Sequence, residues 1–403
     1  MADGPLTILA AAPAYWPATA FGGPIPVMRE LAKRLTERGH RLDVVTTSIL
    51  DLHRRPAFRS RLDEVDGARV HYLGTPLAYR WMGVAPSLPL ELRRLPRPDV
   101  VHLYGFRDPL TTATALWCLA RGIPYVLEPL GMFRPRLRKV RLKEGFDRGL
   151  GRPLAARAEA VVTASERERE DVIAFGLDPE RVVVRGNGFP QAPAGLDGAA
   201  VRAGLVVPGG APLALYVGRI ADGKGIEHLV EAARRAPDAH VVIAGPDDRH
   251  RATARLREAE REPGLAGRLH VLPPSDGAPW ELYAAADAIV LASSGESFGM
   301  AAAEAAAAGA AVVVSDRCGV AGWFEEGEAL VVPYEPEAIV PGENGMLVAA
   351  GDVQAAADAL RRLAVDPELR RRYGERSLEL MRGWGYEPSI ENFVAAVRAA
   401  AAR

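Results

Sequence analysis

The sequence predicts an α/β protein with two Rossmann-like domains, each built on a parallel sheet with helices on both faces. The chain has 403 residues, which is enough for two buried cores. Short apolar runs alternate with helical patterns, and this alternation is typical of parallel sheets. The alternation starts again after residues 186–210, a stretch rich in Gly, Pro and Ala that we interpret as a linker.

Each element follows from the spacing of apolar residues. In the first half, apolar runs predict strands over 6–12, 42–47, 100–103, 125–127 and 160–165. Helices are expected over 27–35, ended by Gly39, and over 110–121. The second half predicts strands over 213–217, 239–244, 269–272, 288–292 and 311–315, and helices over 226–235, 252–262, 280–286 and 299–308.

This pattern assigns residues 1–190 to a first domain and 191–386 to a second. Ligands of open parallel sheets bind at the carboxyl ends of the strands. Two facing domains therefore predict a cleft between them that holds the ligand.

Composition excludes several classes of protein. The chain has 50 basic and 51 acidic residues, a balance that argues against nucleic-acid binding as its main role. Cys118 and Cys318 are its only cysteines, so neither a disulfide framework nor a cysteine metal site is expected, and a reducing cytoplasm fits. A secretory signal pattern and an 18-residue apolar run are both missing, so we expect neither secretion nor membrane spanning.

Two glycine-rich loops follow predicted strands. Gly22 and Gly23 lie between the first strand and the first helix, where amides can approach an anion, although a plain tight turn is as good an explanation. The loop 218–225 contains Arg219 and Lys224 at the start of a helix. We interpret this pair of cations as a diphosphate site, in preference to a solvated surface loop. Only four of the 50 cations are lysines, which makes Lys224 notable.

Two further strand ends carry acids. Glu296 lies in a turn and Glu304 lies in the helix that follows, where the pair could grip a polyol or could simply be solvated helix charges. After the strand that ends at residue 244, Gly245 leads into Pro-Asp-Asp, which favours a turn and helix cap over a metal site.

Together these motifs resemble the retaining glycosyltransferases of family 4. The resemblance rests on Gly218-Arg219-x4-Lys224-Gly225 and on Glu296-Ser-Phe-Gly-x4-Glu304, and it extends over nearly the whole chain. It implies the GT-B architecture, with two facing Rossmann-like domains and a C-terminal helix, residues 387–403, that returns to the first domain. It also implies sugar transfer from a nucleotide diphosphate sugar, with no cofactor and no metal.

The resemblance also implies roles for individual residues. Glu304 would bind the ribose hydroxyls, Glu296 the donor sugar, and Arg219 with Lys224 the diphosphate. The implied donor site comprises Gly22, Gly23, Asn187, Gly218, Arg219, Lys224, Gly245, Glu296, Ser297, Phe298, Gly299, Met300 and Glu304. The candidate catalytic residues are Arg219, Lys224, Glu296 and His102.

The sequence departs from the family pattern on the acceptor side. Many relatives have His-x-His where this chain has His102-Leu-Tyr104, and Leu130 replaces another histidine of one subgroup. A histidine at the end of a strand is often structural, so His102 is a weak candidate for the base. Tyr104, Arg107 and Asp108 are candidates for lining an acceptor pocket.

The resulting expectation is a cytoplasmic, retaining transferase that uses UDP first or GDP second as the donor nucleotide. Its acceptor would be a hydroxyl of a glycan, a lipid-linked glycan or a natural product. A nucleotide-sugar epimerase of the same architecture and a non-catalytic nucleotide-sugar-binding protein stay open as alternatives. The basic run Arg134–Lys143 is either a solvated helix face or a contact with the inner face of an anionic membrane.

Overall fold

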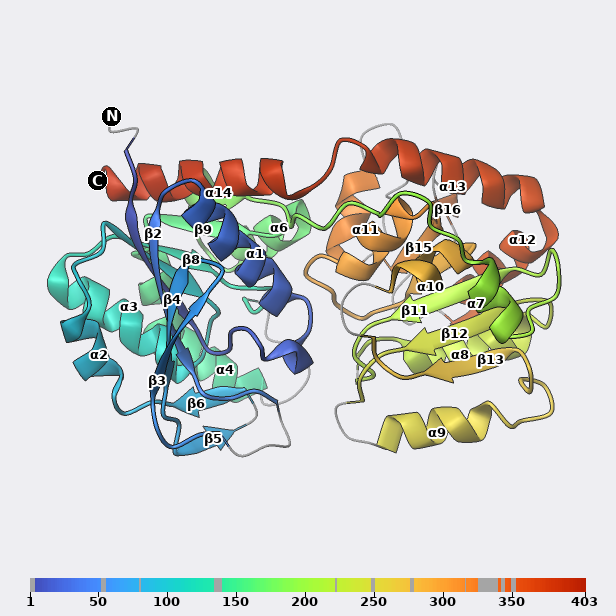
Figure 1. The fold of residues 1–403 in the computed structure, drawn as a ribbon, viewed down its shortest axis with the longest axis horizontal. Coiled ribbons are helices and arrows are strands. Elements are labelled where there is room, and N and C mark those ends of the chain that lie inside the picture. Colours follow the sequence, from blue (N-terminus) through green and yellow to red (C-terminus); the bar gives the residue numbers. More distant parts are fainter. Residues whose placement is uncertain are drawn as a thin grey trace. The chain divides into compact units, whose positions relative to one another are not determined.

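The chain forms two compact units (Figure 1). The structure is a computed structural model that describes residues 4–51, 56–79, 81–133, 140–221, 223–247, 251–275, 279–315, 317–324, 340–341, 345–348 and 353–403. Unit 1 comprises Met1–Gly188 and Tyr386–Arg403, and unit 2 comprises Phe189–Gly385. These junctions lie within two residues of the domain boundaries expected from the sequence. Among the helices of the described residues, none has the length and apolarity needed to cross a membrane.

Unit 1 contains an eight-stranded sheet with the order β10-β9-β8-β7-β1-β2-β4-β3. All neighbouring strands are parallel except β3 and β4, which form an antiparallel pair at the edge. The strands are β1 (Thr7–Ala12), β2 (Arg41–Thr47), β3 (Arg61–Val65), β4 (Ala68–Leu73), β7 (Val100–Tyr104), β8 (Tyr125–Glu128), β9 (Ala160–Thr163) and β10 (Val182–Val184), with a separate hairpin of β5 (Leu77–Tyr79) and β6 (Met82–Val84). The helices are α1 (Pro24–Glu37), α2 (Leu88–Arg94), α3 (Pro109–Arg121), α4 (Val140–Phe146), α5 (Arg152–Ala156), α6 (Glu166–Ala174) and α14 (Tyr386–Ala401).

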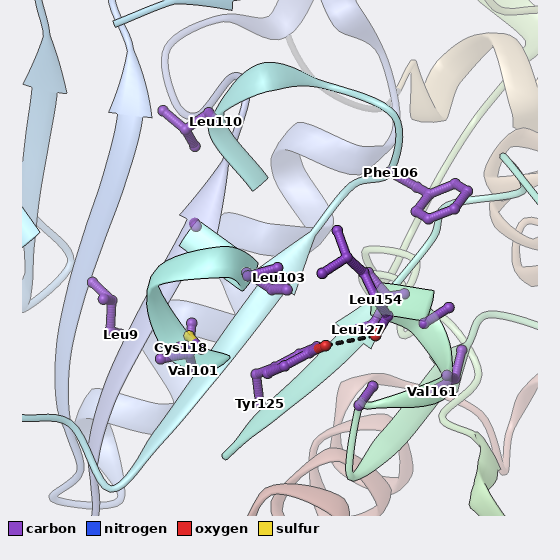
Figure 2. Close-up of a cluster of buried hydrophobic side chains, with 14 of the residues drawn as sticks. Leu9, Val101, Leu103, Phe106, Leu110, Cys118, Tyr125, Leu127, Leu154 and Val161 are labelled. Atoms are coloured by element: carbon purple, nitrogen blue, oxygen red, sulfur yellow. Dashed lines mark hydrogen bonds between the residues drawn. The ribbon is translucent and has the colours of Figure 1, made fainter. Parts of the chain in front are cut away.

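Alternate residues of each central strand enter opposite cores, as the two-residue period of a strand requires. Leu9 and Val101 belong to one core, which side chains from α2, α3, α5 and α6 cover. Figure 2 shows Leu9 and Val101 with residues of α3 and α5 from this core. Ile8 and Val100 belong to the other core, which α1 and α14 cover. Both faces of the parallel strands are therefore buried, which explains why these strands are almost continuously apolar in sequence.

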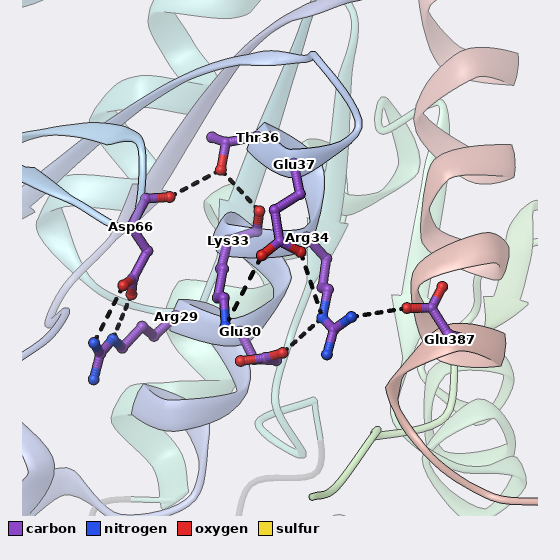
Figure 3. Close-up of polar contacts among 8 residues, drawn as sticks. All are labelled: Arg29, Glu30, Lys33, Arg34, Thr36, Glu37, Asp66 and Glu387. Atoms are coloured by element: carbon purple, nitrogen blue, oxygen red, sulfur yellow. Dashed lines mark hydrogen bonds and ion pairs between the residues drawn. The ribbon is translucent and has the colours of Figure 1, made fainter.

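Helix α14 completes the second core of unit 1 although it is the last element of the chain. Its buried residues Ile390, Phe393, Ala396, Val397 and Ala400 pack with strand residues of that core. At its first turn, Glu387 forms an ion pair with Arg34 of α1 at 3.1 Å (Figure 3). It forms a second ion pair, at 2.5 Å, with Arg38, the residue that follows α1. The C-terminal segment is thus joined to unit 1 by apolar burial along its length and by charge at its start.

Unit 2 contains a seven-stranded sheet with the order β13-β12-β11-β14-β15-β17-β16, parallel except for the β16–β17 pair. Its strands are β11 (Leu213–Val217), β12 (His240–Ala244), β13 (Leu269–Leu272), β14 (Ala288–Leu291), β15 (Ala311–Ser315), β16 (Val340–Pro341) and β17 (Gly345–Val348). Its helices are α7 (Ala199–Gly204), α8 (Ile226–Arg235), α9 (Arg251–Ala259), α10 (Trp280–Ala285), α11 (Met300–Ala307), α12 (Val353–Val365) and α13 (Pro367–Met381). Because β11 is next to β14, the loops that follow these two strands start at the same edge of the sheet.

Candidate active site

The candidate site in unit 2 begins with loops that only glycine permits. Gly225 has φ of 72°, and a Cβ there would lie 2.1 Å from the carbonyl oxygen of Ala292. Gly245 has φ of 147°, and a Cβ there would lie 2.0 Å from the carbonyl oxygen of Gly218. The loops after β11, β12 and β14 therefore touch through their backbones, and a side chain at either glycine would force them apart.

Lys224 and Glu296 form an ion pair that joins the loop after β11 to the loop after β14. Their side chains are 21% and 25% exposed, so each remains reachable from solvent. The backbone supports the same geometry, because the amide of Ser294 donates to the carbonyl of Gly223 at 2.9 Å. The structure thus brings together the lysine expected to hold a diphosphate and the glutamate expected to hold a sugar.

A second segment fixes the backbone around Glu296. The Glu296 amide donates to the carbonyl of Arg317 at 3.0 Å, and the Gly319 amide donates to the carbonyl of Glu296 at 2.8 Å. The Cys318 thiol donates to the carbonyl of Phe298 at 3.4 Å, and a Cβ on Gly299 would lie 2.7 Å from its sulfur. Gly299, with φ of 107°, is therefore required at the N-cap of α11 for space as well as for conformation.

Glu304 lies in the second turn of α11, among buried alanines such as Ala303 and Ala305. Burial raises the pKa of its carboxyl to about 7, although a hydrogen bond from Tyr283 opposes this rise. The Tyr283 hydroxyl donates to Glu304 Oε2 at 2.8 Å.

The remaining predicted donor residues of unit 2 lie on the same loops. The Tyr216 hydroxyl donates to the backbone carbonyl of Arg219 at 2.9 Å, which ties this loop to β11. Ser297 and Phe298 fall in the turn before α11, and Met300 is the first residue of that helix. Asp247, after Gly245, accepts a hydrogen bond from the Thr253 amide near the start of α9, which is the expected capping role. In the part of the chain that the structure describes, no group of three or more His, Cys, Asp or Glu side chains could hold a metal.

In unit 1, the predicted glycine loop forms the entry to α1. Gly22 has φ of 81°, and its amide donates to the Thr19 carbonyl at 2.9 Å inside a short 3-10 turn. Gly23 is the N-cap residue of α1, with no side-chain cap. Pro24 and Pro26 have no amide hydrogen, and the Ile25 and Val27 amides donate to the carbonyls of Gly22 and Gly23, so an anion site at this loop stays a prediction.

His102 and Asn187 lie in a buried polar network. His102 Nε2 is 3.1 Å from Glu128, whose other oxygen accepts a 2.6 Å hydrogen bond from Arg185. Arg185 also donates to Asn187 Oδ1 and to Ser389 Oγ of α14, both at 2.7 Å. Although burial alone would raise it, pairing with Arg185 and His102 lowers the pKa of Glu128. His102 is 2% exposed and packs on Phe393, so it has the contacts of a structural histidine.

The three predicted acceptor residues also have structural contacts. Asp108 caps α3 by accepting from the amides of Leu110 and Thr111. Arg107 forms an ion pair with Asp147 at 2.6 Å, and the Tyr104 hydroxyl donates to the Pro24 carbonyl at 2.9 Å. Each of the three side chains thus has a structural partner, and their place in an acceptor pocket stays a prediction.

The basic run Arg134–Lys143 falls largely outside the described residues, which resume at α4. Leu130, at the position of a family histidine, has φ of 55°, and the next amide, that of Gly131, donates to buried Glu168.

Comparison with known proteins assigns the family. Residues 22–188 match the model described as "Glycosyl transferase 4-like domain", and residues 199–379 match "Glycosyl transferases group 1". The 2-deoxystreptamine N-acetyl-D-glucosaminyltransferase of Streptomyces fradiae is 30% identical over 409 residues, which cover 90% of this chain and 92% of that protein. This chain is a family 4 glycosyltransferase.

Further comparisons agree with this glycosyltransferase assignment. The alpha-maltose-1-phosphate synthase of Mycolicibacterium smegmatis is 32% identical over 302 residues, covering 68% of this chain and 72% of that one. The crystal structure of HepE from Anabaena in complex with UDP and glucose superposes with a TM-score of 0.74 at 18% identity, covering 97% and 98% of the two chains. The predicted GT-B fold, with two α/β domains and parallel sheets, is thus confirmed.

Sequence reasoning missed two residues around the glycosyltransferase site. Tyr283 was assigned only to a helix, and Cys318 was read only as a cysteine outside any disulfide. A tyrosine on a short helix among apolar residues such as Leu282 and Ala284 is a weak signal, because such tyrosines usually fill cores. Only the fold shows that their polar atoms reach the loop before α11 and Glu304.

Proposed function

We propose that this glycosyltransferase is a retaining, metal-independent enzyme that transfers a sugar from UDP-sugar, or alternatively GDP-sugar, to a hydroxyl acceptor. The observation that supports this proposal most is the ion pair between Lys224 and Glu296. The two side chains are in contact and partly exposed to solvent. A lysine can neutralise a diphosphate and a glutamate can bind the hydroxyls of the sugar attached to it, so the pair suits the point where the two are joined.

In this proposal the residues have distinct roles. Lys224 and Arg219 neutralise the charge that grows on the β-phosphate as the nucleotide leaves, while Glu296 binds the sugar hydroxyls. The amides of Gly299 and Met300 at the start of α11 add favourable dipoles. Preorganised charges of this kind typically lower a barrier by about 3–4 kcal/mol per group. Because two fixed cations face the diphosphate, the reaction as we propose it requires no divalent ion.

Glu304 binds the ribose of the nucleotide in this scheme. One carboxylate can accept hydrogen bonds from both hydroxyls of a vicinal diol, since it has about four lone-pair positions. Its side chain is only partly exposed, so a hydrogen bond made there is stronger than one made in water. His102 is not assigned the role of general base, because the leaving phosphate can take the proton from the hydroxyl of the acceptor.

The first test is a thermal-shift screen with UDP, GDP, ADP and their glucose, N-acetylglucosamine and mannose conjugates. UDP comes first because the structure of the Anabaena relative contains it. A nucleotide present at a hundred times its Kd should stabilise the protein by about 2.7 kcal/mol. Loss of the shift on adding EDTA would contradict metal-independent binding.

The second test separates the three candidate functions. The donor that binds is incubated with and without acceptors, beginning with 2-deoxystreptamine, which the name of the Streptomyces relative contains. A transferase forms an α-linked product only with acceptor, detected by NMR. Conversion of the donor to an epimer without acceptor would favour the epimerase, and binding without turnover would favour the binding protein.

A further inference from the structure

The carboxylate of Glu304 is held by a hydrogen bond from a side chain of a different helix. Among the described residues, Tyr283 of α10 is the side chain that bonds to the Glu304 carboxylate, through its hydroxyl at 2.8 Å. The tyrosine is 1% exposed, and its ring meets that of Trp280 edge-on at 5.8 Å. It therefore has little freedom to move away from the carboxylate.

Within α11, the neighbouring side chains do not compete with Tyr283 for the Glu304 carboxylate. The neighbouring residues on the helix are Met300, Ala301, Ala307 and Ala308, which offer no polar side-chain atom. A glutamate side chain has three rotatable bonds, so ordering it costs conformational entropy. A hydrogen bond from a fixed partner offsets this cost. The hydroxyl of Tyr283 occupies Oε2 and leaves Oε1 and the second lone pair of Oε2 for another ligand.

We propose that Tyr283 is a positioning residue that fixes the Glu304 carboxylate for recognition of the nucleotide's ribose hydroxyls. This inference rests on the proposed function, in which Glu304 binds the ribose. Tyr283 itself makes no contact with the nucleotide in this proposal. Its hydroxyl acts by holding the carboxylate in the rotamer that accepts the diol.

The experiment measures the Kd values of UDP and of 2′,3′-dideoxy-UDP by calorimetry, with GDP and its dideoxy analogue as a second pair. The variants are Tyr283→Phe, Glu304→Ala and Tyr125→Phe. Tyr125 is a matched control, because it is also 1% exposed and donates its hydroxyl to a backbone carbonyl, that of Leu154 in unit 1 (Figure 2). Both tyrosine variants keep the ring, so loss of packing is small.

The decisive quantity is the difference in Kd between the ribose-containing nucleotide and its dideoxy analogue. Tyr283→Phe should weaken binding of the ribose-containing diphosphate about fivefold to twentyfold, which is part of the value of a hydrogen bond to a charged group. It should leave the Kd of the dideoxy analogue unchanged. Tyr125→Phe should change neither Kd, while both tyrosine variants lower the melting temperature to a similar extent.

Two sets of contrary results are distinguishable. In the first, Glu304→Ala removes the preference for the ribose-containing ligand, but Tyr283→Phe weakens binding of both ligands equally or of neither. This result would overturn the positioning role of Tyr283 and leave the proposed function standing. If Glu304→Ala keeps that preference, or the unaltered protein binds neither UDP nor GDP, the proposed function itself fails.

Discussion

At the residue scale, Glu304 has an acid group that titrates near neutral pH. Burial raises its pKa to about 7, well above the 4.5 of a free glutamate side chain. The carboxylate accepts hydrogen bonds from a diol, whereas the protonated form loses part of this capacity. In the proposed function, in which Glu304 binds the ribose, the protonation state of this one side chain links nucleotide binding to pH.

We predict that nucleotide affinity falls as the pH decreases below 7. If only the ionised form binds well, the Kd at pH 6 should be about tenfold higher than at pH 8, because the ionised fraction of a group with a pKa of about 7 falls from about nine-tenths at pH 8 to about one-tenth at pH 6. Calorimetric titration across this range measures the effect. Glu304→Gln is the control, since in this variant only the nucleotide phosphates still titrate. An equally steep pH profile in this variant would show that Glu304 is not the cause of the pH dependence.

The raised pKa of Glu304 has the opposite effect on the stability of the nucleotide-free protein: stability falls with rising pH, whereas nucleotide affinity rises. The folded-state pKa is higher than the unfolded one, so the native state holds the proton more tightly and stability decreases as pH rises from about 4.5 to 7. Glu304→Gln should therefore increase the free energy of unfolding above pH 7, by about 1–3 kcal/mol, and change it little at pH 4.5. Urea unfolding at the two pH values measures the difference.

Lys224 permits a separate test of charge compensation. Lys224→Ala should lower kcat about 100- to 1,000-fold with a smaller change in donor Kd, because the lost charge acts mainly on the leaving phosphate. Steady-state kinetics with the donor found in the thermal screen measures both constants. Lys33→Ala is the matched control, since Lys33 is an exposed lysine that is 3.9 Å from Glu37 on α1. An unchanged kcat in Lys224→Ala would remove Lys224 from the mechanism.

At the element scale, α14 is attached to unit 1 by two kinds of charge contact. Glu387, whose side chain is 56% exposed, pairs at the surface with Arg34 (Figure 3). It also pairs with Arg38. Ser389, two residues later, accepts from Arg185, whose side chain is 1% exposed and which also pairs with Glu128. Water screens the first set of contacts and not the second, so their energetic values differ.

Substitution should separate the two sets. Glu387→Ala should cost no more than about 1 kcal/mol of unfolding free energy, as expected for exposed ion pairs. Arg185→Met should cost about 3–5 kcal/mol, because it leaves Glu128 charged, buried and without its cation. Urea titration of both variants tests this, and equal effects would show that the buried network has no special role.

The elements differ in how readily the sequence predicts them. Central strands such as β1 and β12 are predictable because burial on both faces demands a continuous apolar run. Strand β3 was not predicted, since four of its five residues are exposed and its pattern is Arg-Leu-Asp-Glu-Val. The partner of α14 could not be found from spacing alone, because the helix packs on strands more than 200 residues earlier in the chain.

The same limit applies to the candidate site. Arg219, Lys224, Glu296 and Glu304 stand out by residue type and by glycine context, and these are local properties of the sequence. The contacts that hold them, from Tyr283 and from residues 317–319, join segments that lie apart along the chain. Hydrogen bonds between such segments depend on how the strands are ordered in the sheet, which hydrophobic periodicity does not specify.

At the scale of the whole molecule, unit 2 is one continuous segment and unit 1 is not. We predict that residues 189–385 expressed alone fold and bind the nucleotide, because the Lys224–Glu296 pair and the Tyr283–Glu304 contact lie entirely within them. Calorimetry should give a Kd within about tenfold of the full chain, a difference of about 1.4 kcal/mol. A folded but non-binding fragment would show that unit 1 supplies an essential part of the site.

The place of α14 after unit 2 in the order of the chain has a consequence for synthesis. Chains usually fold domain by domain from the N-terminus as they leave the ribosome, at about 5–20 residues per second. Here the core face that Ile390 and Phe393 cover stays open while the intervening residues 189–385 are made, which takes about 10–40 s at that rate. The second unit can thus reach its native state before the first, and the core face of the nascent first unit stays uncovered until α14 emerges.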